Sequence, residues 1–447
     1  MNPYWTNGLT TLYRADARAI PLPDASVHCV VTSPPYYQLR RYKGQDERYL
    51  GAEGSPEEYL ENLLVCFREV RRVLREDGVC WVNIGDTRGG YHGNSRVPDE
   101  DAPSNKPGYI ENMRPSQGAA SLQRLGIPER FALAMQADGW VWRDSIVWAK
   151  PSVMPESVSS TRWERCRVKM GGNRQSTQGW AVETGQRDSK GGLPPSDTIW
   201  APCPGCPKCL PNDGWVLRRG SWRTTHSHEM IYMFVKGAGY YSDGEAVKTA
   251  QAQSSIDRYR TPFHPSDGWV DANRTTPQGD RGYLASRGAN RRSVWSDVTP
   301  EHQPSGTGHY ATFPTGLPRI CIQASTSEAG VCATCGNQWA RMVEHQVSLS
   351  NQAEGYTKAS GRNDETRPGT YLGAESRTIA WRPACGCPSA SPVPATVLDP
   401  FGGMMTTCVA AQRLGRRSVG LDLSEAYLAK AQERLEAAPM PLVVDRR

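Results

Sequence analysis

The sequence predicts an α/β fold built around a mostly parallel, doubly wound sheet. Short apolar runs of strand length alternate with segments of helical period near both ends of the chain. Two of these runs lead directly into rigid or glycine-containing loops, one beginning at Ser33 and one at Pro400. Open α/β sheets bind their ligands at the carboxyl ends of strands. We therefore expect each of these two loops to contact a ligand.

The N-terminal elements carry clear local signals. Residues 25–32 end in a run of apolar residues that is typical of a buried strand. Ser55 is a good helix N-cap, and Glu58 completes a capping box. Apolar residues then recur with the helical period until Gly78, where we expect the helix to end before a strand over residues 79–84.

The same alternation continues to the C-terminus. Two helices and two strands are expected in the middle of the chain, the helices over 128–138 and 313–324 and the strands over 141–148 and 229–235. The last part should form a strand, a helix, a strand and a helix, over 396–399, 406–414, 418–422 and 424–435.

The composition narrows the class of protein. The chain has 447 residues, of which 38% are hydrophobic, so it can bury a sizeable core. The net charge of +6 is small for this length and favours a polyanionic partner only weakly. No apolar run approaches the roughly 18 residues that a membrane span needs. Residues 1–10 lack the apolar core of a signal peptide, so we expect a cytoplasmic protein with no membrane partner.

The loop near residue 400 has the features of a cofactor site. Asp399 ends an apolar strand, and Gly402 and Gly403 follow in a turn that leads into a helix. Such a turn lets a ligand approach backbone N–H groups at the helix start. Asp422 ends the next strand, where nucleotide-binding folds place an acid that binds ribose hydroxyls. A ribose-containing cofactor is expected, and it need not be NAD, because the G-x-G-x-x-G fingerprint is absent. Glycines that merely form a tight strand-to-helix turn are the alternative.

The loop Ser33-Pro34-Pro35-Tyr36 follows the first buried strand directly. Two prolines fix the backbone and remove two donors, which leaves the Ser33 hydroxyl and the Pro34 carbonyl as acceptors beside an aromatic ring. Acceptors that hold the two hydrogens of a ring-conjugated amine out of plane would localise its lone pair for attack on a methyl group. A rigid turn that only ends a strand is the alternative reading of these residues.

The combination of the two loops is more specific than either one. Ser33-Pro34-Pro35-Tyr36 and the later Asp-Pro-Phe-Gly-Gly-x-x-Thr-Thr together resemble the amino-methylating DNA methyltransferases of the β order, in which the catalytic motif precedes the cofactor motif. The resemblance covers most of the chain. It implies a Rossmann-like, S-adenosylmethionine-dependent methyltransferase fold with permuted motif order. The cysteine spacing and the composition add inserted zinc-binding and target-recognition segments to this expected fold.

The resemblance also implies roles for individual residues. The catalytic loop would be Ser33, Pro34, Pro35 and Tyr36. The cofactor would be bound by ten residues from several motifs, namely Asp16, Thr32, Phe313, Asp399, Pro400, Phe401, Gly403, Thr406, Thr407 and Asp422. One departure is Met405, which stands where the family usually has a second glycine. Side chains as large as Met405 and its neighbour Met404 would weaken cofactor binding if they reached the cofactor, but Gly403, Thr406 and Thr407 match the family, so we expect binding to survive.

The implied reaction moves a methyl group from S-adenosylmethionine to an exocyclic amine in double-stranded DNA. Ser33 at the first loop position resembles the cytosine-N4 members, whereas adenine-N6 members more often carry Asp or Asn there. Either base must be flipped out of the duplex to reach the loop, with Tyr36 stacking on it. The alternatives are adenine-N6 methylation, a catalytically weak zinc-bearing DNA-binding protein, and a methyltransferase for protein glutamine or RNA. The resemblance further implies a prokaryotic or phage-type protein and a cognate restriction endonuclease as partner.

Eight of the 13 cysteines form two sets with metal-ligand spacing. The first set is Cys166, Cys203, Cys206 and Cys209, and the second is Cys332, Cys335, Cys385 and Cys387. Four thiolates at such spacing suit tetrahedral structural zinc. Reduced, unligated thiols are the alternative for both sets, and an iron–sulfur cluster is an alternative for the first. His226 or His228 would replace Cys166 if that residue were not a ligand.

Two segments are candidates for DNA contact. The run from Arg218 to Arg223 is basic with an interleaved tryptophan, and a solvated strand edge is its alternative reading. Residues 251–305 lack a core pattern and are rich in Arg, Asn and Gln, as a target-recognition region would be.

The expected domain organisation follows from these assignments, in chain order. It comprises a catalytic half (1–160), a Cys-rich insert (161–215), catalytic strands (216–250), the target-recognition region (251–305), a cofactor-closing helix (306–330), a second Cys-rich insert (331–390) and a cofactor-binding half (391–447).

Overall fold

The structure is a computed structural model in which the chain folds as two compact units. The large unit contains residues 1–151 and 228–447, and the small unit contains residues 152–227. The residues that the structure describes are 1–38, 50–88, 123–151, 153, 160–169, 200–220, 222–250, 254, 288–299, 313–349, 371–388 and 391–440.

The large unit is organised around a sheet that has nine strands in the described part of the chain. In spatial order these are β1 (Trp5–Thr6), β2 (Thr10–Arg14), β17 (Arg417–Asp422), β16 (Thr396–Asp399), β3 (Val27–Thr32), β4 (Leu74–Ile84), β10 (His228–Val235), β5 (Val141–Ala149) and β11 (Val294–Trp295). Neighbouring strands are parallel except in the pairs β1–β2, β4–β10 and β10–β5. The predicted mostly parallel α/β sheet is confirmed.

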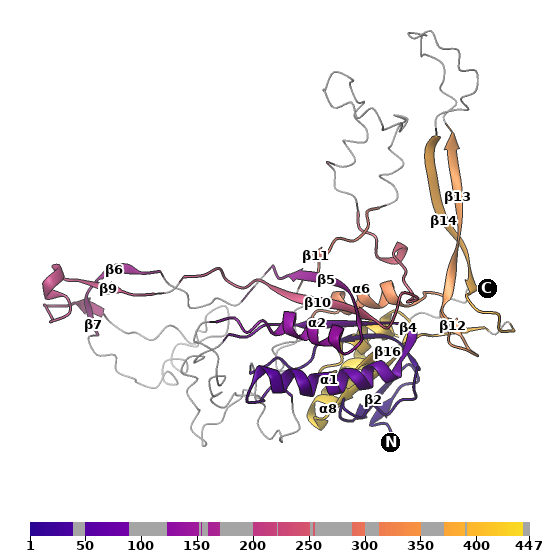
Figure 1. The fold of residues 1–447 in the computed structure, drawn as a ribbon, viewed down its shortest axis with the longest axis horizontal. Helices are drawn as coiled ribbons and strands as arrows, with labels where there is room; N and C mark the ends of the chain where they lie inside the picture. Colours follow the sequence, from indigo (N-terminus) through magenta and orange to yellow (C-terminus); the bar gives the residue numbers. More distant parts are fainter. Residues whose placement is uncertain are drawn as a thin grey trace, which may run out of the picture. The chain divides into compact units, whose positions relative to one another are not determined.

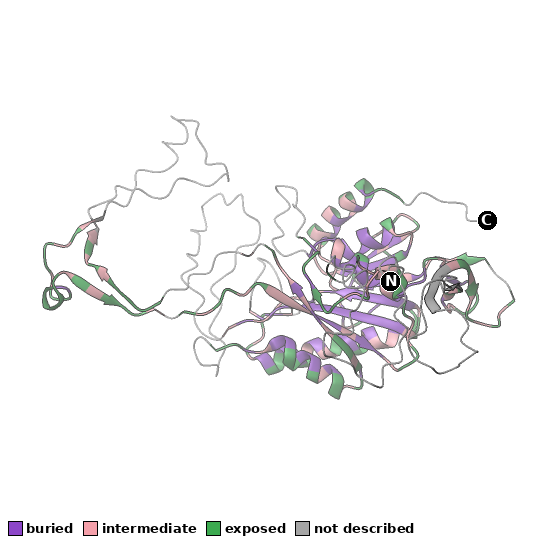
Figure 2. Ribbon diagram, turned by 90° about the horizontal axis from the view of Figure 1, so that it is seen from above, coloured by how far each residue is buried: buried purple, intermediate pink, exposed green. Residues whose placement is uncertain are grey.

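Helices cover both faces of this sheet (Figure 1). Helices α1 (Pro56–Val73) and α2 (Ile127–Ala137) pack on one face. Helices α6 (Gly316–Ser325) and α7 (Thr406–Arg413) pack on the other, where α8 (Glu425–Ala437) contacts α7, β17 and β2. Buried residues concentrate in the central strands and on the inner sides of the helices (Figure 2). The sheet is therefore buried on both faces, and its strand ends remain as places for a ligand.

The end of α1 differs from the sequence prediction. The helix begins as expected, because the Ser55 hydroxyl accepts a hydrogen bond from the Glu58 N–H at 3.1 Å. It ends at Val73 rather than at Gly78, and Leu74 already belongs to β4. Leu74 is fully buried and fits the apolar pattern of the helix and of the strand equally well. Periodicity alone could not separate the two elements there.

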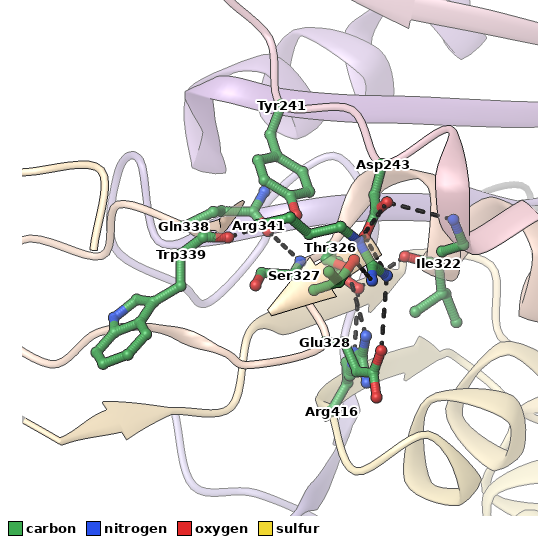
Figure 3. A network of polar contacts seen from close by, with 12 residues as sticks. Tyr241, Asp243, Ile322, Thr326, Ser327, Glu328, Gln338, Trp339, Arg341 and Arg416 are labelled. Carbon is green, nitrogen blue, oxygen red and sulfur yellow. Dashed lines mark hydrogen bonds and ion pairs between the residues drawn. The ribbon is translucent and has the colours of Figure 1, made fainter. Parts of the chain in front are cut away.

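A two-stranded arm of the large unit had no clear sequence signal. Strand β13 (Trp339–Leu349) pairs antiparallel with β14 (Tyr371–Pro383), and the two lie side by side (Figure 1). Polar contacts fix the start of β13 to the large unit (Figure 3). Arg341 donates to both oxygens of Asp243 at 2.9 Å, and the Gln338 side chain accepts from the Ser327 N–H at 2.6 Å. The arm therefore has a firmly held base within the second predicted Cys-rich insert.

The small unit consists of two short antiparallel ribbons. Strand β6 (Arg162–Arg165) pairs with β9 (Trp215–Arg218), and β7 (Arg167–Lys169) pairs with β8 (Trp200–Pro202). A 3₁₀ turn, η1 (Leu210–Asn212), precedes β9. The predicted insert 161–215 lies inside this unit, and β9 continues slightly past its predicted end.

The predicted target-recognition region 251–305 lies largely outside the described residues. Of its described part, Val294 and Trp295 form β11 at the edge of the large sheet, parallel to β5. The side chain of Trp295 is buried in the core.

Candidate active site at the carboxyl edge of the sheet

Three loops from distant parts of the sequence meet at the carboxyl edge of the sheet. Strands β17, β16 and β3 are adjacent and parallel, so the residues that follow them lie along one edge. Asp422 ends β17, Asp399 ends β16, and Thr32 ends β3. The Thr32 hydroxyl donates to Asp399 Oδ1 at 2.6 Å. This bond joins the strand that precedes the Ser-Pro-Pro-Tyr loop to the strand that precedes the glycine loop.

Asp399 is buried, with 2% of its surface exposed. Burial raises the pKa of this carboxyl to about 6, although hydrogen bonds from Thr32, Thr407 and the Phe401 N–H act in the opposite direction. The Phe401 N–H donates to Asp399 Oδ1 at 3.2 Å. Several donors hold this buried carboxyl group in a fixed position, and its pKa lies close to neutral pH.

Asp422 fixes the glycine loop from the neighbouring strand. Its Oδ2 accepts from the Gly403 N–H at 3.0 Å, and its Oδ1 accepts from the Ser424 N–H at 2.7 Å. Burial is the largest influence on this group and raises its pKa to about 6, while the backbone donors lower it. The carboxyl groups at the ends of β16 and β17 therefore both have a pKa that burial raises.

The Met405 side chain lies in the protein interior. It is fully buried and belongs to the core cluster formed with Leu12 and α8. A Cβ atom on Gly402 or on Gly420 would lie only 2.2 Å from Met405 Sδ, so the thioether fills the space that these two glycines leave. Met404 is also buried, with 3% of its surface exposed. Both side chains pack into the protein interior.

The backbone conformation of Met405 explains why a glycine would suit this position. Its φ angle is +54°, in the left-handed region, immediately before α7 begins. Only glycine adopts this region without a steric penalty. The chain accepts the strained conformation and gains a buried side chain.

The hydroxyl of Tyr36 is held by a polar network. It donates to Glu229 Oε2 at 2.8 Å, and it lies 3.3 Å from Asn83 Oδ1. The other carboxylate oxygen of Glu229 pairs with the Lys150 ammonium group. The Ser33 hydroxyl lies 3.5 Å from the Tyr36 oxygen. Burial and Glu229 raise the pKa of Tyr36 well above its ordinary value, so the phenol stays protonated and its single proton points to Glu229.

Close packing holds the ring and backbone of the same loop. A Cβ atom on Gly85 would lie 2.6 Å from the Tyr36 ring, and one on Gly51 would lie 2.9 Å from the Tyr36 carbonyl oxygen. The Tyr59 hydroxyl donates to the Pro35 carbonyl at 2.8 Å. Because both the ring and the backbone are fixed, the Ser33 hydroxyl is presented from a rigid support.

Sequence reasoning assigned no role to Glu229, Lys150 and Asn83. Glu229 begins the strand expected over 229–235, and Lys150 follows the strand expected over 141–148. Strand β10 runs antiparallel between β4 and β5, which places Met230 beside Ile84 and His228 beside Ala149. This register brings Asn83 and Glu229 to Tyr36 and brings Lys150 to Glu229. A pairing between strands about 145 residues apart leaves no local signal, so only the polar residues at the strand ends could have indicated the network.

The other predicted cofactor residues are distributed around these loops. Asp16 follows β2, the strand that pairs with β17, and forms an ion pair with Arg18 at 2.7 Å. Thr406 and Thr407 begin α7, where the Thr407 hydroxyl donates to the Val31 carbonyl at 3.0 Å. Phe313 is buried in the core cluster on the α6 side. Pro400 and Phe401 follow β16 directly.

The four cysteines of the first set come together in the small unit. All four sulfur atoms lie within 4.8 Å of one another. The Cys166–Cys206, Cys206–Cys209 and Cys203–Cys209 sulfur distances are 3.8, 3.6 and 3.9 Å. Thiolates bound to one zinc ion at about 2.3 Å lie about 3.8 Å apart in a tetrahedron. The geometry fits a zinc ion without rearrangement and does not need His226 or His228.

The cysteines of the second set come together in the large unit, again within 4.8 Å. Hydrogen bonds from the backbone N–H groups of Cys335 and Thr334 lower the pKa of Cys332 to about 6. This set is fastened to the amino edge of the sheet, because Arg75 donates to the Cys335 carbonyl at 3.0 Å. His28 Nε2 contacts the Gly336 carbonyl at 2.9 Å. The second set thus lies against the sheet edge opposite the candidate active site.

Among the described residues, no helix combines the length and apolar character that crossing a membrane requires.

The chain is similar to DNA-modifying enzymes. A family model described as DNA methylase matches residues 27–333 and 389–433. The type II methyltransferase M.Cfr9I of Citrobacter freundii is 28% identical over 97% of this chain and 90% of its own length. The type II methyltransferase M.SmaI of Serratia marcescens is 26% identical over 91% of this chain and 83% of its own length.

A solved structure described as PvuII DNA methyltransferase (cytosine-N4-specific) is 14% identical, with a TM-score of 0.44, over 97% of this chain and 88% of that one. The family match covers both candidate loops and most of the chain. The chain therefore belongs to the DNA methylase family, the amino DNA methyltransferases that modify cytosine N4 or adenine N6.

Proposed function

We propose that this protein methylates the exocyclic N4 amine of cytosine at a specific site in double-stranded DNA, with S-adenosylmethionine as methyl donor. The observation that carries the proposal is the 2.6 Å hydrogen bond between Thr32 and Asp399. It fixes the Ser33 loop and the glycine loop at one edge of one sheet. A donor bound by one loop would thus face an amine bound by the other.

The cofactor would be held by the two acids at the carboxyl edge. Asp422 ends the second strand of the motif, where a carboxylate accepts hydrogen bonds from ribose hydroxyls. Asp399 and the turn at Gly403 would contact the rest of the cofactor, because a glycine turn allows close backbone approach. The inward packing of Met405 leaves this edge free of its side chain. S-adenosylmethionine supplies a methyl group on a positively charged sulfur.

The amine would be oriented by the Ser33 loop. The Tyr36 proton is directed to Glu229, so the Ser33 hydroxyl can turn its own proton toward the Tyr36 oxygen and keep its lone pairs for the amine. An amine whose hydrogens are held by Ser33 and the Pro34 carbonyl has its lone pair exposed for attack. The nitrogen lone pair would bond to the methyl carbon as the carbon–sulfur bond breaks and leaves neutral S-adenosylhomocysteine, and the extra proton on the nitrogen would pass to water. No covalent enzyme intermediate is required.

The choice of cytosine N4 over adenine N6 rests on Ser33, which resembles the cytosine-N4 members of the family. Nucleosides from DNA treated with the protein and S-adenosylmethionine should contain N4-methylcytosine by mass spectrometry. N6-methyladenine alone would overturn the cytosine assignment and retain the methyltransferase. Calorimetry should detect binding of S-adenosylmethionine to the wild-type chain. Absence of both binding and product would favour a DNA-binding protein that has lost catalysis.

We also propose that each cysteine set holds one structural zinc ion. The sulfur positions of both sets support this, since each set of four lies within 4.8 Å. Metal analysis of the purified protein should find about two zinc ions per chain. Less than one would contradict both sites, and iron in place of zinc would favour a cluster in the first set. Site-specific methylation would protect DNA against a cognate restriction endonuclease, which we propose as a functional partner. An endonuclease from the same source that cuts the unmethylated site and spares the methylated one would support this.

A further inference from the structure

The small unit carries more net positive charge per residue than the whole chain. Residues 152–227 contain 11 Lys and Arg residues against 6 Asp and Glu residues, a net formal charge of +5. The complete chain carries only +6. Four thiolates around one zinc ion would add a charge of −2, and the unit would still be positive. About one sixth of the sequence therefore carries most of the excess positive charge.

The β6–β9 ribbon divides its side chains between two different faces. Cross-strand partners lie on the same face of an antiparallel pair, and faces alternate along each strand. The pairs Trp163–Leu217 and Arg165–Trp215 therefore share one face. We call these four residues the aromatic–basic face. It carries no acidic side chain.

The opposite face is partly neutralised by its own ion pairs. It carries the pairs Arg162–Arg218 and Glu164–Val216. Arg162 contacts the Glu164 carboxylate at 2.6 Å, and Arg218 contacts it at 3.5 Å. Its two arginines are thus partly occupied within the ribbon.

The aromatic–basic face exposes large side chains to solvent. Trp163 is 51% exposed, Trp215 is 38% exposed, and Leu217 is 36% exposed. The Arg165 guanidinium lies 4.4 Å from the centre of the Trp215 ring, and Arg165 donates to the Asp213 carbonyl at 2.9 Å. Exposed apolar groups of this size on one ribbon face are typical of a binding surface. The stacked guanidinium is preoriented rather than mobile.

The first cysteine set holds this ribbon in shape. Cys166 follows β6 directly, and its N–H donates to the Gly214 carbonyl, just before β9, at 2.8 Å. The Cys166 carbonyl accepts from the Cys203 N–H at 2.9 Å, which joins the ribbon to the cysteine loop. A two-stranded ribbon alone is marginally stable in water. A zinc ion bound by the four cysteines would hold the ribbon rigid.

We propose that the aromatic–basic face of the β6–β9 ribbon binds duplex DNA. A two-stranded ribbon fits the major groove, where arginine pairs with guanine edges and apolar side chains contact thymine methyl groups. The positive charge of the unit would attract the phosphates. A protein partner would not require this charge. The inference rests on the proposed function only in taking DNA as the substrate, and it assigns target contact to a segment other than residues 251–305.

The test uses the zinc-loaded full chain and two matched variants. Arg165→Gln and Arg162→Gln each remove one positive charge from β6, but from opposite faces of the ribbon. Affinity is measured by fluorescence anisotropy with a labelled 40-base-pair duplex. The duplex contains the methylated site found by sequencing, or a random sequence if no methylation is found. Zinc content is measured for each variant.

We expect Arg165→Gln and Trp163→Ala to weaken DNA binding roughly tenfold or more, as losses of base-edge and thymine-methyl contacts do. Arg162→Gln should change it by roughly twofold or less, because Arg162 is paired with Glu164. Unchanged affinity in the first two variants with zinc retained would overturn the inference. So would equal weakening by all three variants, since bulk charge would then explain it. If no variant and no wild-type protein methylates DNA, the proposed function fails, while a selective loss of binding still supports this face.

Discussion

The two ends of strand β3 are built from similar parts and perform different tasks. At its amino end, the buried His28 contacts the Gly336 carbonyl, 308 residues away. At its carboxyl end, the buried Thr32 donates to Asp399, 367 residues away. Both bonds join distant segments to the central strand. The difference lies in the partners.

Backbone groups are the partners at the amino end. His28 Nδ1 accepts from the Thr396 N–H at 3.1 Å, so both ring nitrogens are occupied by main-chain groups. The partner at the carboxyl end is an ionisable carboxyl group with a raised pKa. A site whose polar groups are all satisfied by the protein can only stabilise the fold. A site that keeps an acid and a serine hydroxyl at a strand end can also act on a ligand. Changes at the two ends should therefore separate stability from turnover.

The largest effect should follow from breaking the second cysteine set. Cys332→Ser should release one zinc ion per chain, because Cys332 is the buried ligand of the set. The large unit should lose more than about 4 kcal/mol of stability, which lowers Tm by roughly 5 °C in a unit of this size. Differential scanning calorimetry with metal analysis provides the measurement.

Cys206→Ser is the matched control for this change. It removes one ligand of the first set, which lies in the small unit. It should also cost one zinc ion, but it should leave the Tm of the large unit and the affinity for S-adenosylmethionine unchanged. Equal destabilisation of the large unit by both substitutions would show that the sets do not act separately.

A change at the other end of β3 should affect turnover alone. Ser33→Ala removes the hydroxyl that is proposed to orient the amine and should lower kcat roughly 100-fold, the usual cost of one preorganised polar group. Ser33 is only partly buried and the loop is held by Tyr59 and Glu229, so Tm should change by less than about 2 °C. Single-turnover methylation of duplex DNA gives the rate. A wild-type rate would remove Ser33 from the mechanism.

The sequence predicted the local elements around β3 better than the contacts at its two ends. Strand β16 was predicted with its observed bounds, Thr396–Asp399, and both loops were placed at strand ends. These features depend on short apolar runs and on local residue types, which sequence displays directly. The contacts of His28 with Gly336 and of Tyr36 with Glu229 were not predicted. They depend on strand order and register between segments far apart in the chain, which periodicity does not encode.

The amino end can be tested without touching a cysteine. His28→Leu leaves the Gly336 carbonyl and the Thr396 N–H buried without a partner, which should cost about 2 kcal/mol of unfolding free energy. Denaturant unfolding at pH 7.5 measures the loss. Zinc content and kcat of the folded variant should match wild type. A fall in kcat at unchanged stability would contradict the division between the two ends.

The same substitution has a pH signature. Burial lowers the pKa of His28 from 6.5 to about 4. The folded state resists protonation while the unfolded chain accepts it, so the wild-type protein loses stability as pH falls from 6.5 to 4. The leucine variant lacks this loss. The gap between the two proteins should therefore narrow with falling pH, and a gap that is constant across this range would contradict the assignment.

The carboxyl end should respond to pH with the opposite sign. Burial raises the pKa of Asp422 to about 6, above its value of 3.8 in the unfolded chain. The stability that this group contributes to the cofactor-free protein is present below pH 3.8 and is lost as pH rises through 6. Cofactor affinity should change in the other direction, because ribose hydroxyls need the ionised acceptor.

Calorimetry of S-adenosylmethionine binding between pH 7.5 and pH 5 tests this expectation. About 90% of a group with a pKa of 6 is protonated at pH 5, so affinity should fall roughly tenfold. Asp422→Asn should bind weakly at every pH and show a smaller dependence. The remaining dependence would come from Asp399, whose pKa is raised in the same way. An affinity independent of pH in the wild-type protein would exclude both acids from cofactor binding.

Met405 tests the division between the two ends most sharply. It lies at the carboxyl edge of the sheet, but its substitution should affect stability and leave cofactor binding unchanged, as substitutions at the amino end should. Met405→Gly relieves a φ angle of +54°, which favours the variant by about 1 kcal/mol, but it removes a fully buried side chain from the core. The net loss should be about 1 kcal/mol. Met405→Ala loses nearly the same packing and keeps the strain, so it should be the less stable variant by about 1 kcal/mol. Neither change should alter the affinity for S-adenosylmethionine. A glycine variant that binds the cofactor more tightly would show that the Met405 side chain does reach the cofactor site. Residues at the carboxyl edge of the sheet could then no longer be separated into those that stabilise the fold and those that contact a ligand.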